Sequence, residues 1–425
     1  MKRGFYTIMA AQFFSSLADN ALFVAAVEML RSAGAPTWQR TALVPMFALF
    51  YVVLAPFLGA FSDAVPKGRV MFYANAVKVA ACLTMLYGSH PLIAYAFVGL
   101  GAAAYSPAKY GILTELLPTS QLVKANGWIE GLTILSVILG VGLGGQLIGP
   151  RMSALLLSLH VPDIDFGIRT PAQATVAFMV LLYAIAAAFN LRIPRTETPL
   201  EPFAGRVADL VRDFSQCNAR LWDDKLGQIS LATTTLFWGA SANLRYLVLA
   251  WAAAALAYDT PRATVLLLLV GLGTAAGALI ASVTVRLVHA THVILLGAAL
   301  GAAVVAINGM HSVWVAGPFL VVLGAIGGFM VVPMNALLQH RGHNLMGSGR
   351  SIAVQNFNEQ AAILGMGAFY SALTRAGLSV FVAITAFGLL VAFVSWLIWR
   401  WHRRNLAQHR EEVEELLAIA RSDSH

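Results

Sequence analysis

The chain has 425 residues, of which 59% are hydrophobic and only 11% are charged, and its mean hydropathy is +0.73. A soluble domain is about 45–50% apolar and about 25% charged, so this composition excludes an ordinary water-soluble protein. The net charge of +8 raises the question of a nucleic-acid partner. The basic residues, however, lie in short segments between apolar stretches, where they set membrane topology. We therefore expect a polytopic membrane protein with no nucleic acid as partner.

Apolar stretches of about 20 residues, enough to cross a ~30 Å hydrocarbon core, recur along the chain. The first is longer than a signal peptide and contains Asp19, so we expect it to be retained as a helix. Taken in order, the stretches predict about twelve membrane-spanning helices: 6–30, 40–62, 69–88, 91–117, 121–149, 170–191, 229–257, 262–287, 291–309, 312–339, 350–374 and 378–401.

Basic residues gather in alternate connections between these stretches. By the positive-inside rule, the connections that hold them and both termini face the cytoplasm. The residues concerned are Lys67 and Arg69, Lys124, the basic residues of the segment 192–225, Arg286, Arg341 and Arg350, and Arg400, Arg403 and Arg404.

One connection is much longer than the others and lies midway along the chain. It covers residues 192–228 and contains an amphipathic stretch, Phe203 to Leu226, whose apolar face holds Val207, Leu210, Val211 and Phe214. We predict that this linker separates an N-terminal six-helix bundle, 1–191, from a C-terminal one, 229–401. Residues 402–425 follow as a cytoplasmic tail, with a second helical stretch over Gln408 to Ile419 that is rich in glutamate.

The two predicted halves share polar and proline positions. The interval from Asp19 to Arg245 equals the interval from Pro107 to Pro333, and it sets Lys109 opposite Asn335. The fifth and eleventh predicted helices each open with an amide and a carboxylate at i,i+4, which lie on one helix face: Asn126 with Glu130, and Gln355 with Glu359. These matches predict an all-α fold of two pseudosymmetric six-helix halves.

Charged residues inside the predicted spans are the strongest functional signal. A charge near the bilayer centre costs about 2.5–3.5 kcal/mol on insertion scales, so it persists where it pairs or faces a wet cavity. Asp19 and Arg245 are the deepest. They could form a structural ion pair; alternatively, Arg245 binds a substrate anion, for which its planar guanidinium is suited, while Asp19 exchanges partners with Arg245 or accepts a substrate cation.

A loop between the second and third predicted helices, Gly59 to Arg69, resembles the loop signature of the major facilitator superfamily, although Ala64-Val65-Pro66 departs from that pattern. Asp63 could pair with Arg69 or with a neighbouring helix terminus and so gate the cytoplasmic side. An ordinary basic loop is the alternative. A shallower layer of acids, Glu115, Glu130 and Glu359, is predicted either to lock the halves or to contact substrate.

Four segments resemble a narrower family, the bacterial lysophospholipid transporters of the major facilitator superfamily: Ala11–Leu22, Ser106–Pro118, Leu338–His343 and Ser351–Glu359. The resemblance covers both halves. It implies the superfamily fold and the transfer of lysophosphatidylethanolamine and lysophosphatidylglycerol from the outer to the inner leaflet of the bacterial inner membrane. A partner acyltransferase/acyl-ACP synthetase would then re-acylate them. We expect a monomer embedded among membrane lipids.

The resemblance also implies roles for individual residues. The predicted substrate-binding residues are Asp19, Asn20, Lys109, Arg245, Gln355 and Asn356, and the predicted gating residues are Asp63, Arg69, Glu115, Glu130 and Glu359. Apolar cavity walls would accommodate the single acyl chain. Protonation of a buried carboxyl is one candidate for energy coupling.

Three other classes of protein are alternatives, of which a scaffold or receptor predicts no charges inside the membrane. The pattern His160 to Asp165 fits the H-x4-D motif of glycerolipid acyltransferases, but it lies in a short periplasmic connection without a globular domain. With no nucleotide loop, metal-ligand spacing or nucleophile elbow, we expect no enzyme, no cofactor and no metal. An exporter of drugs or small solutes would share the fold; a deep arginine and lysine favour a phosphate-bearing substrate over apolar cationic drugs.

Overall fold

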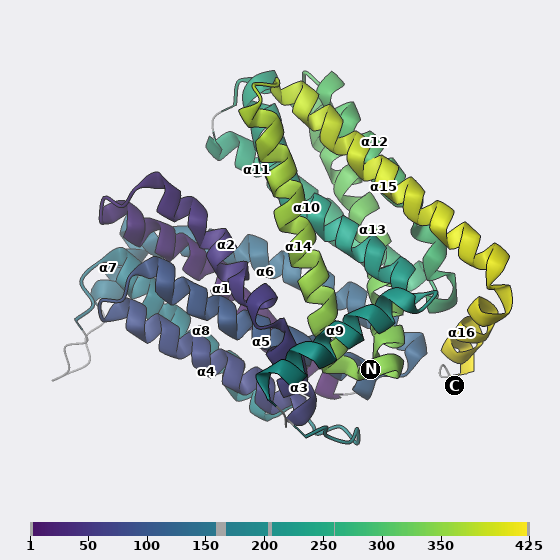
Figure 1. Ribbon diagram of the computed structural model, residues 1–425. Helices are drawn as coiled ribbons and strands as arrows, with labels where there is room; N and C mark the ends of the chain where they lie inside the picture. The colour runs from purple at the N-terminus through teal and green to yellow at the C-terminus, as the bar shows by residue number, and fades with distance from the viewer. Residues whose placement is uncertain (1–2, 159–166, 203–205, 259, 423–425) are drawn as a thin grey trace. The chain divides into compact units, whose positions relative to one another are not determined.

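The computed structural model of the protein describes residues 3–158, 167–202, 206–258 and 260–422, and its elements are helices (Figure 1). Up to the linker they follow one another in the order α1 Arg3–Ser32, α2 Thr37–Val53, α3 Ala55–Ala64, α4 Lys67–Leu86, α5 Pro91–Leu116, η1 Thr119–Gln121, α6 Leu122–Ile148, α7 Pro150–Ser158 and α8 Pro171–Leu191. Thr170 starts α8 with a capping box, in which it accepts from the backbone of Gln173 while the Gln173 side chain accepts from Thr170.

In its described residues, the linker holds one helix, α9, and the remaining elements run to the C-terminal tail. They are α9 Val207–Asp223, α10 Gly227–Leu256, α11 Thr260–Thr284, η2 Leu287–Val293, α12 Leu296–Ala306, η3 Ile307–Gly309, α13 Val313–Met346, α14 Ser348–Arg375, α15 Val380–Gln408 and α16 Arg410–Ser422. Asp224 caps α10, because its Oδ1 accepts from the backbone N–H groups of Leu226 at 3.2 Å and Gly227 at 2.6 Å.

Among the described residues, nine helical segments are long and apolar enough to cross a membrane, and the bent pair of α2 and α3 makes a tenth. The helices α10 and α14 occupy the two other predicted spans. The predicted series of about twelve membrane helices is therefore confirmed as a series of helices in the predicted order.

The second predicted span is broken rather than straight. Helices α2 and α3 meet at Leu54 with a bend of 63°. Pro56 stands in the first turn of α3, and because proline has no N–H it cannot continue the hydrogen bonds of the preceding helix. Residues 40–62 were predicted as a single span, without this bend.

Two local predictions need correction. The tenth span does not end at residue 339, because α13 continues to Met346 and holds His340 and Arg341 as buried helical residues rather than loop residues. In α9, the predicted apolar face is only partly packed. Val207 and Val211 are exposed, whereas Leu210 and Phe214 are partly buried and lie at helical spacing from the buried Cys217 and Leu221.

The chain folds into two compact units. Unit 1 comprises Met1–Leu116, Leu135–Phe214 and Ser348–Ala353; unit 2 comprises Leu117–Ile134, Ser215–Gly347 and Val354–His425. The first six residues of α14 therefore belong to unit 1, and the first half of α6 to unit 2. The boundaries of the two halves predicted from the sequence remain a prediction.

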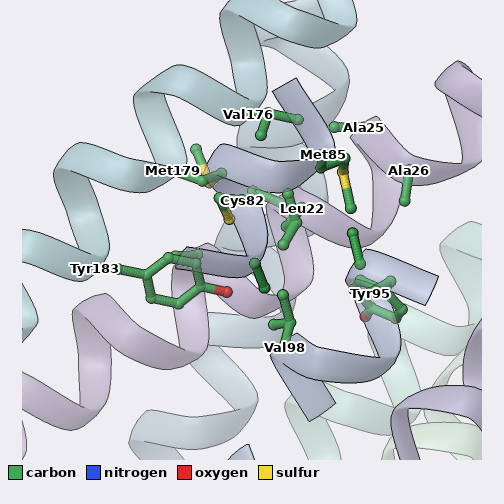
Figure 2. Packing of buried hydrophobic residues seen from close by; sticks show 14 of the residues in the cluster. Leu22, Ala25, Ala26, Cys82, Met85, Tyr95, Val98, Val176, Met179 and Tyr183 are labelled. Carbon is green, nitrogen blue, oxygen red and sulfur yellow. The ribbon is translucent and has the colours of Figure 1, made fainter. Parts of the chain in front are cut away.

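The core of unit 1 lies where α1, α4, α5 and α8 pack on one another. Figure 2 shows Leu22, Cys82, Val98 and Met179 converging from these four helices, with Tyr183 beside them. Each of these five side chains is buried. The cluster fixes the spacing of the helices that carry the polar groups described below.

The core of unit 2 is built on the packing of α11 against α13. Glycines four residues apart line the crossing on both helices, Gly273 and Gly277 on α11 and Gly324 and Gly328 on α13. A Cβ atom at any of the four would overlap a backbone carbonyl oxygen of the facing helix. Small residues at this spacing let two membrane helices approach backbone to backbone.

Candidate functional site

The Asp19 carboxylate lies in unit 1 and is held by two residues that come from other helices. Lys78 of α4 donates to both carboxylate oxygens, with Nζ 2.8 Å from each, and the Tyr183 hydroxyl of α8 donates to Oδ1 at 2.7 Å. Ser15 accepts a further hydrogen bond from Lys78 at 3.0 Å. The side chain of Lys78 is 1% exposed and that of Asp19 is 17% exposed. The ion pair is thus largely buried, and the Asp19 carboxylate is its more exposed member.

Aromatic rings complete the surroundings of Lys78. Its Nζ lies 5.6 Å from the ring centre of Tyr105 and 5.3 Å from that of Tyr183, distances at which a ring face attracts a cation. Sequence reasoning missed both Lys78 and Tyr183. A signal for Lys78 was available, because it stands inside the predicted span 69–88, and an intramembrane lysine requires a nearby carboxylate.

Two other predicted substrate residues of unit 1 have different surroundings. The Asn20 amide donates to the backbone carbonyl of Ser16 at 2.8 Å, one turn earlier in its own helix. Lys109 is buried in α5, and its Nζ lies 4.0 Å from the ring centre of Tyr110.

Arg245 lies in α10 of unit 2 and is exposed. Its Nε donates to the backbone carbonyl of Ala242 at 3.0 Å, and its guanidinium lies 6.0 Å from the ring centre of Tyr246. Within the described ranges of the chain, no carboxylate forms an ion pair with it. The remaining N–H donors of the guanidinium suit an anion with two or more oxygen atoms.

The predicted amide and carboxylate of the eleventh helix do meet. Gln355 Nε2 donates to Glu359 Oε1 at 2.7 Å and to Asn335 Oδ1 at 3.0 Å, and the three side chains are buried in unit 2. This confirms the shared helix face. Asn356, next in α14, is only partly buried.

A second buried amide contact in unit 2 involves the fifth predicted helix. Asn126 and Gln339 exchange two hydrogen bonds, each of 2.9 Å. Glu130 lies one turn after Asn126 in α6 and is buried.

The predicted gate residue Asp63 pairs with the helix terminus rather than with Arg69. Its carboxylate accepts from the backbone N–H groups of Gly349 at 2.7 Å and Arg350 at 2.9 Å, in the first turn of α14. Lys67 supplies the cation, with Nζ 2.7 Å from Oδ1. Arg69 is exposed at the start of α4. The helix break at Val65 and Pro66 brings Lys67 inward, which is the physical reason that the predicted arginine is not the partner.

Glu115 belongs to the same buried cluster. Its Oε1 accepts from the Ser348 hydroxyl at 2.7 Å and lies 3.5 Å from Lys67 Nζ, while its Oε2 accepts from the Thr196 hydroxyl at 2.6 Å. Asp63, Lys67, Glu115 and Ser348 therefore join α3, α4, α5 and the first turn of α14 within unit 1, and we call these four residues the gate cluster.

Arg350 extends the gate cluster toward the surface of unit 1. Its guanidinium donates to Asp213 at 2.8 Å and to Glu201, and it lies 3.8 Å from Asp63. Sequence reasoning counted Arg350 only as a topology signal. The two acids lie in the long linker, so their meeting with Arg350 has no local sequence signature.

The acyltransferase-like pattern His160 to Asp165 lies outside the residues that the structure describes. In the described part of the chain, no group of three or more His, Cys, Asp or Glu side chains is placed to hold a metal ion.

Comparison with known sequences places the chain among transporters. The family described as Major Facilitator Superfamily matches residues 8–366. The chain is 36% identical over 406 residues to the lysophospholipid transporter LplT of Photorhabdus laumondii, an alignment that covers 95% of this chain and 96% of that protein. It is 39% identical over 381 residues to LplT of Yersinia enterocolitica, with 89% of each chain covered.

Solved structures agree on the fold. The human organic anion transporter MFSD10 superposes with a TM-score of 0.67 at 17% identity, covering 93% of this chain and all (100%) of that one. The fucose:proton symporter FucP of E. coli superposes with a TM-score of 0.65 at 13% identity, covering 94% and 98%. The protein is thus an all-α membrane protein with the superfamily fold, and the chain belongs to the Major Facilitator Superfamily and, within it, to the family of the LplT transporters.

Proposed function

We propose that this protein moves lysophospholipids, in particular lysophosphatidylethanolamine and lysophosphatidylglycerol, from the outer to the inner leaflet of the bacterial inner membrane by alternating access. The observation that carries the proposal is the identity of 36–39% to proteins named lysophospholipid transporters, over almost the whole chain. The two alignments cover 95% and 89% of this chain, so the relatives' substrate class is the natural one to test.

The chemistry of the charged side chains supports the same substrate class. A lysophosphatidylethanolamine head group carries a phosphate and an ammonium. Arg245 presents free guanidinium donors that suit the phosphate, and the Asp19 carboxylate, 17% exposed, suits the ammonium. The single acyl chain needs an apolar path, which a protein rich in apolar helices can provide.

We further propose that Lys78 is the resting partner of Asp19. The ion pair neutralises the acid when no substrate is bound, and an incoming ammonium competes with the lysine for the same two oxygens. Asn20, Lys109, Gln355 and Asn356 remain proposed head-group contacts.

For the gate, we propose that Asp63 holds the first turn of α14 through the amides of Gly349 and Arg350, and that release of this turn accompanies opening of the cytoplasmic side. Glu115 supports the same contact through Ser348. Glu130 and Glu359 are proposed as further members of the lock, and Arg69 is no longer needed as the partner of Asp63.

The cellular setting forms part of the proposal. We place both termini in the cytoplasm, in line with the distribution of basic residues, and we expect a monomer. Re-acylation by an acyltransferase/acyl-ACP synthetase would consume the delivered lysophospholipid and keep net movement inward.

The proposal can be tested in spheroplasts supplied with radiolabelled lysophosphatidylethanolamine. We expect uptake by the parent protein and a loss of at least tenfold in Asp19→Asn and Arg245→Gln variants that reach the membrane in normal amounts. A matched control is Arg375→Gln, which removes an exposed arginine from the far end of α14. Uptake that is the same with and without the parent protein, together with efflux of cationic dyes, would favour a drug or small-solute exporter instead.

A further inference from the structure

A pocket of about 980 Å³ lies in unit 2, and none of the charged side chains of the candidate functional site is among its described lining residues. Its walls come from the start of α6 with η1, the end of α11 with its connection to η2, and α16. The helix α16 is anchored there, because Val413 and Ala420 are buried and α16 contacts both η1 and η2. The C-terminal tail is therefore one wall of a defined pocket.

Among the described residues that line this pocket, the charged ones are basic. They are Lys124 and Arg286, and His289 lines it as well; no aspartate or glutamate belongs to this described lining. In the described parts of the chain, neither the Lys124 ammonium nor the Arg286 guanidinium donates to another residue, and both side chains are exposed. Ser120 adds a hydroxyl at the same wall. Uncompensated cations around a concave site attract anions.

The acidic residues of α16 do not neutralise these cations from within the pocket. Glu411, Glu412, Glu414 and Glu415 are exposed and are not part of the lining. Glu414 pairs with Arg410 at 2.7 Å, and Glu412 lies 3.6 Å from His409, so two of the four are engaged with neighbours at the start of the tail.

The approach to the pocket is apolar. The last turns of α11 expose Leu279, Ile280 and Val283, with 40%, 51% and 74% of their surface accessible. This helix is one of the candidate membrane spans, which ends at Thr284. Exposed aliphatic side chains at the end of a span face lipid tails, so the basic residues that follow stand at head-group level.

We propose that this pocket binds the head group of an anionic diacyl phospholipid from the adjacent leaflet, with Lys124 and Arg286 on the phosphate and the acyl chains along Leu279, Ile280 and Val283. A phosphate group is also present in free inorganic phosphate; the apolar approach is what favours the lipid. This inference does not rest on the proposed transport of lysophospholipids, because it concerns a separate set of residues.

The test uses the purified full-length protein in a neutral detergent and native mass spectrometry to measure retained phosphatidylglycerol against phosphatidylcholine. We expect preferential retention of phosphatidylglycerol and an affinity lowered about tenfold or more in K124Q/R286Q, since two charge-assisted hydrogen bonds are lost. The charge-retaining variant K124R/R286K should bind as the parent does. The matched control R192Q/R195Q removes two exposed arginines of unit 1 and should leave retention unchanged.

Three outcomes would overturn the inference. Equal retention by K124Q/R286Q and the parent protein would remove the pocket as the site, as would an equal loss in R192Q/R195Q, which would indicate a diffuse charge effect. If millimolar inorganic phosphate displaced phosphatidylglycerol and raised the melting temperature of the protein as much as the lipid does, the pocket would be assigned to a free anion. Melting temperatures of all variants verify that each one is folded.

Discussion

Lys78 illustrates how a membrane protein keeps a charge inside a span. An isolated lysine at that depth is costly, but its ammonium meets both oxygens of Asp19 and the hydroxyl of Ser15. The Tyr183 hydroxyl donates a further hydrogen bond to the Asp19 carboxylate. The acid and the base each depend on the other, so their energetic contributions should be strongly coupled.

This coupling leads to a prediction for a double-mutant cycle. Lys78→Met leaves the Asp19 carboxylate without a cation, and loss of one member of a buried pair typically costs about 3–5 kcal/mol. The double variant Lys78→Met/Asp19→Asn should therefore melt at a higher temperature than Lys78→Met alone. Thermal unfolding of the purified proteins measures both. If the double variant is no more stable than the single one, the pair does not contribute as an ion pair.

Among individual residues, the functional carboxylates could be predicted from the sequence more readily than the residues that bind them. Asp19 and Asp63 stand out because carboxylates are rare in apolar segments, and the i,i+4 contact of Gln355 with Glu359 follows from helix geometry. The partners Lys78 and Arg350 come from distant parts of the chain. Their meeting depends on how the helices pack, and a single sequence holds no direct record of that.

Among the elements, α14 has an unusual start. Its first turn follows Gly347 and is held by Asp63 of α3. An anion near a helix N-terminus binds unpaired N–H groups and the positive end of the helix dipole. Gly349 allows the close approach, since a Cβ atom there would lie 2.5 Å from Asp63 Oδ1.

We predict that Asp63→Asn loosens this turn. The neutral amide keeps one acceptor but loses the charge, so the hydrogen bonds to Gly349 and Arg350 should weaken by about 1 kcal/mol or more. Hydrogen exchange at these two amides should become about fivefold faster or more, with little change in the middle of α14. Unchanged exchange at both amides would contradict the proposed hold of Asp63 on the helix.

Replacing glycine by alanine should change the stability of the protein differently at the crossing of α11 and α13 than at an open position in α14. Gly277→Ala should destabilise the protein by about 1–3 kcal/mol, because its Cβ would overlap the Ala325 carbonyl oxygen. Gly365→Ala, in α14, meets no atom within 4 Å and should be neutral or stabilising by about 0.5–1 kcal/mol. Melting temperatures decide, and equal shifts in the two variants would argue against the close packing.

The order of the helices was predictable because each membrane helix needs a long apolar stretch. The bends and the end points of the helices could not be predicted in this way. Pro56 bends the second span, yet prolines within α5 and α13 leave those helices continuous. The extension of α13 to Met346 includes the buried Arg341, which pairs with Asp224 at 2.6 Å. A tertiary ion pair thus stabilises a helical end that local hydropathy assigns to a loop.

On the scale of the whole molecule, the sequence predicts a definite topology. Basic residues place the α15 end at Arg404 in the cytoplasm and the α13 start at Trp314 in the periplasm; both side chains are exposed. In a background with Cys82→Ala and Cys217→Ala, a cysteine at Trp314 should react with an impermeant maleimide in intact cells. A cysteine at Arg404 should react only after permeabilisation. The reverse pattern would contradict the predicted orientation.

The family and fold were predictable because short segments in both halves carry the resemblance, and the nearly full-length identity to LplT proteins bears it out. What a single sequence could not predict is the division into units, in which Ser348–Ala353 joins the helices of unit 1. Within this segment, the backbone N–H groups of Gly349 and Arg350 donate to the Asp63 carboxylate, and such contacts leave no pattern in hydropathy.

The most direct test of the proposed function measures lysophospholipid movement by the purified protein in liposomes. Labelled lysophosphatidylethanolamine is added to the outer leaflet, and albumin then extracts the label that remains outside. We expect an albumin-resistant pool that grows faster with the parent protein than with Asp19→Asn or with empty liposomes. A pool that grows at the same rate in all three would contradict the proposal.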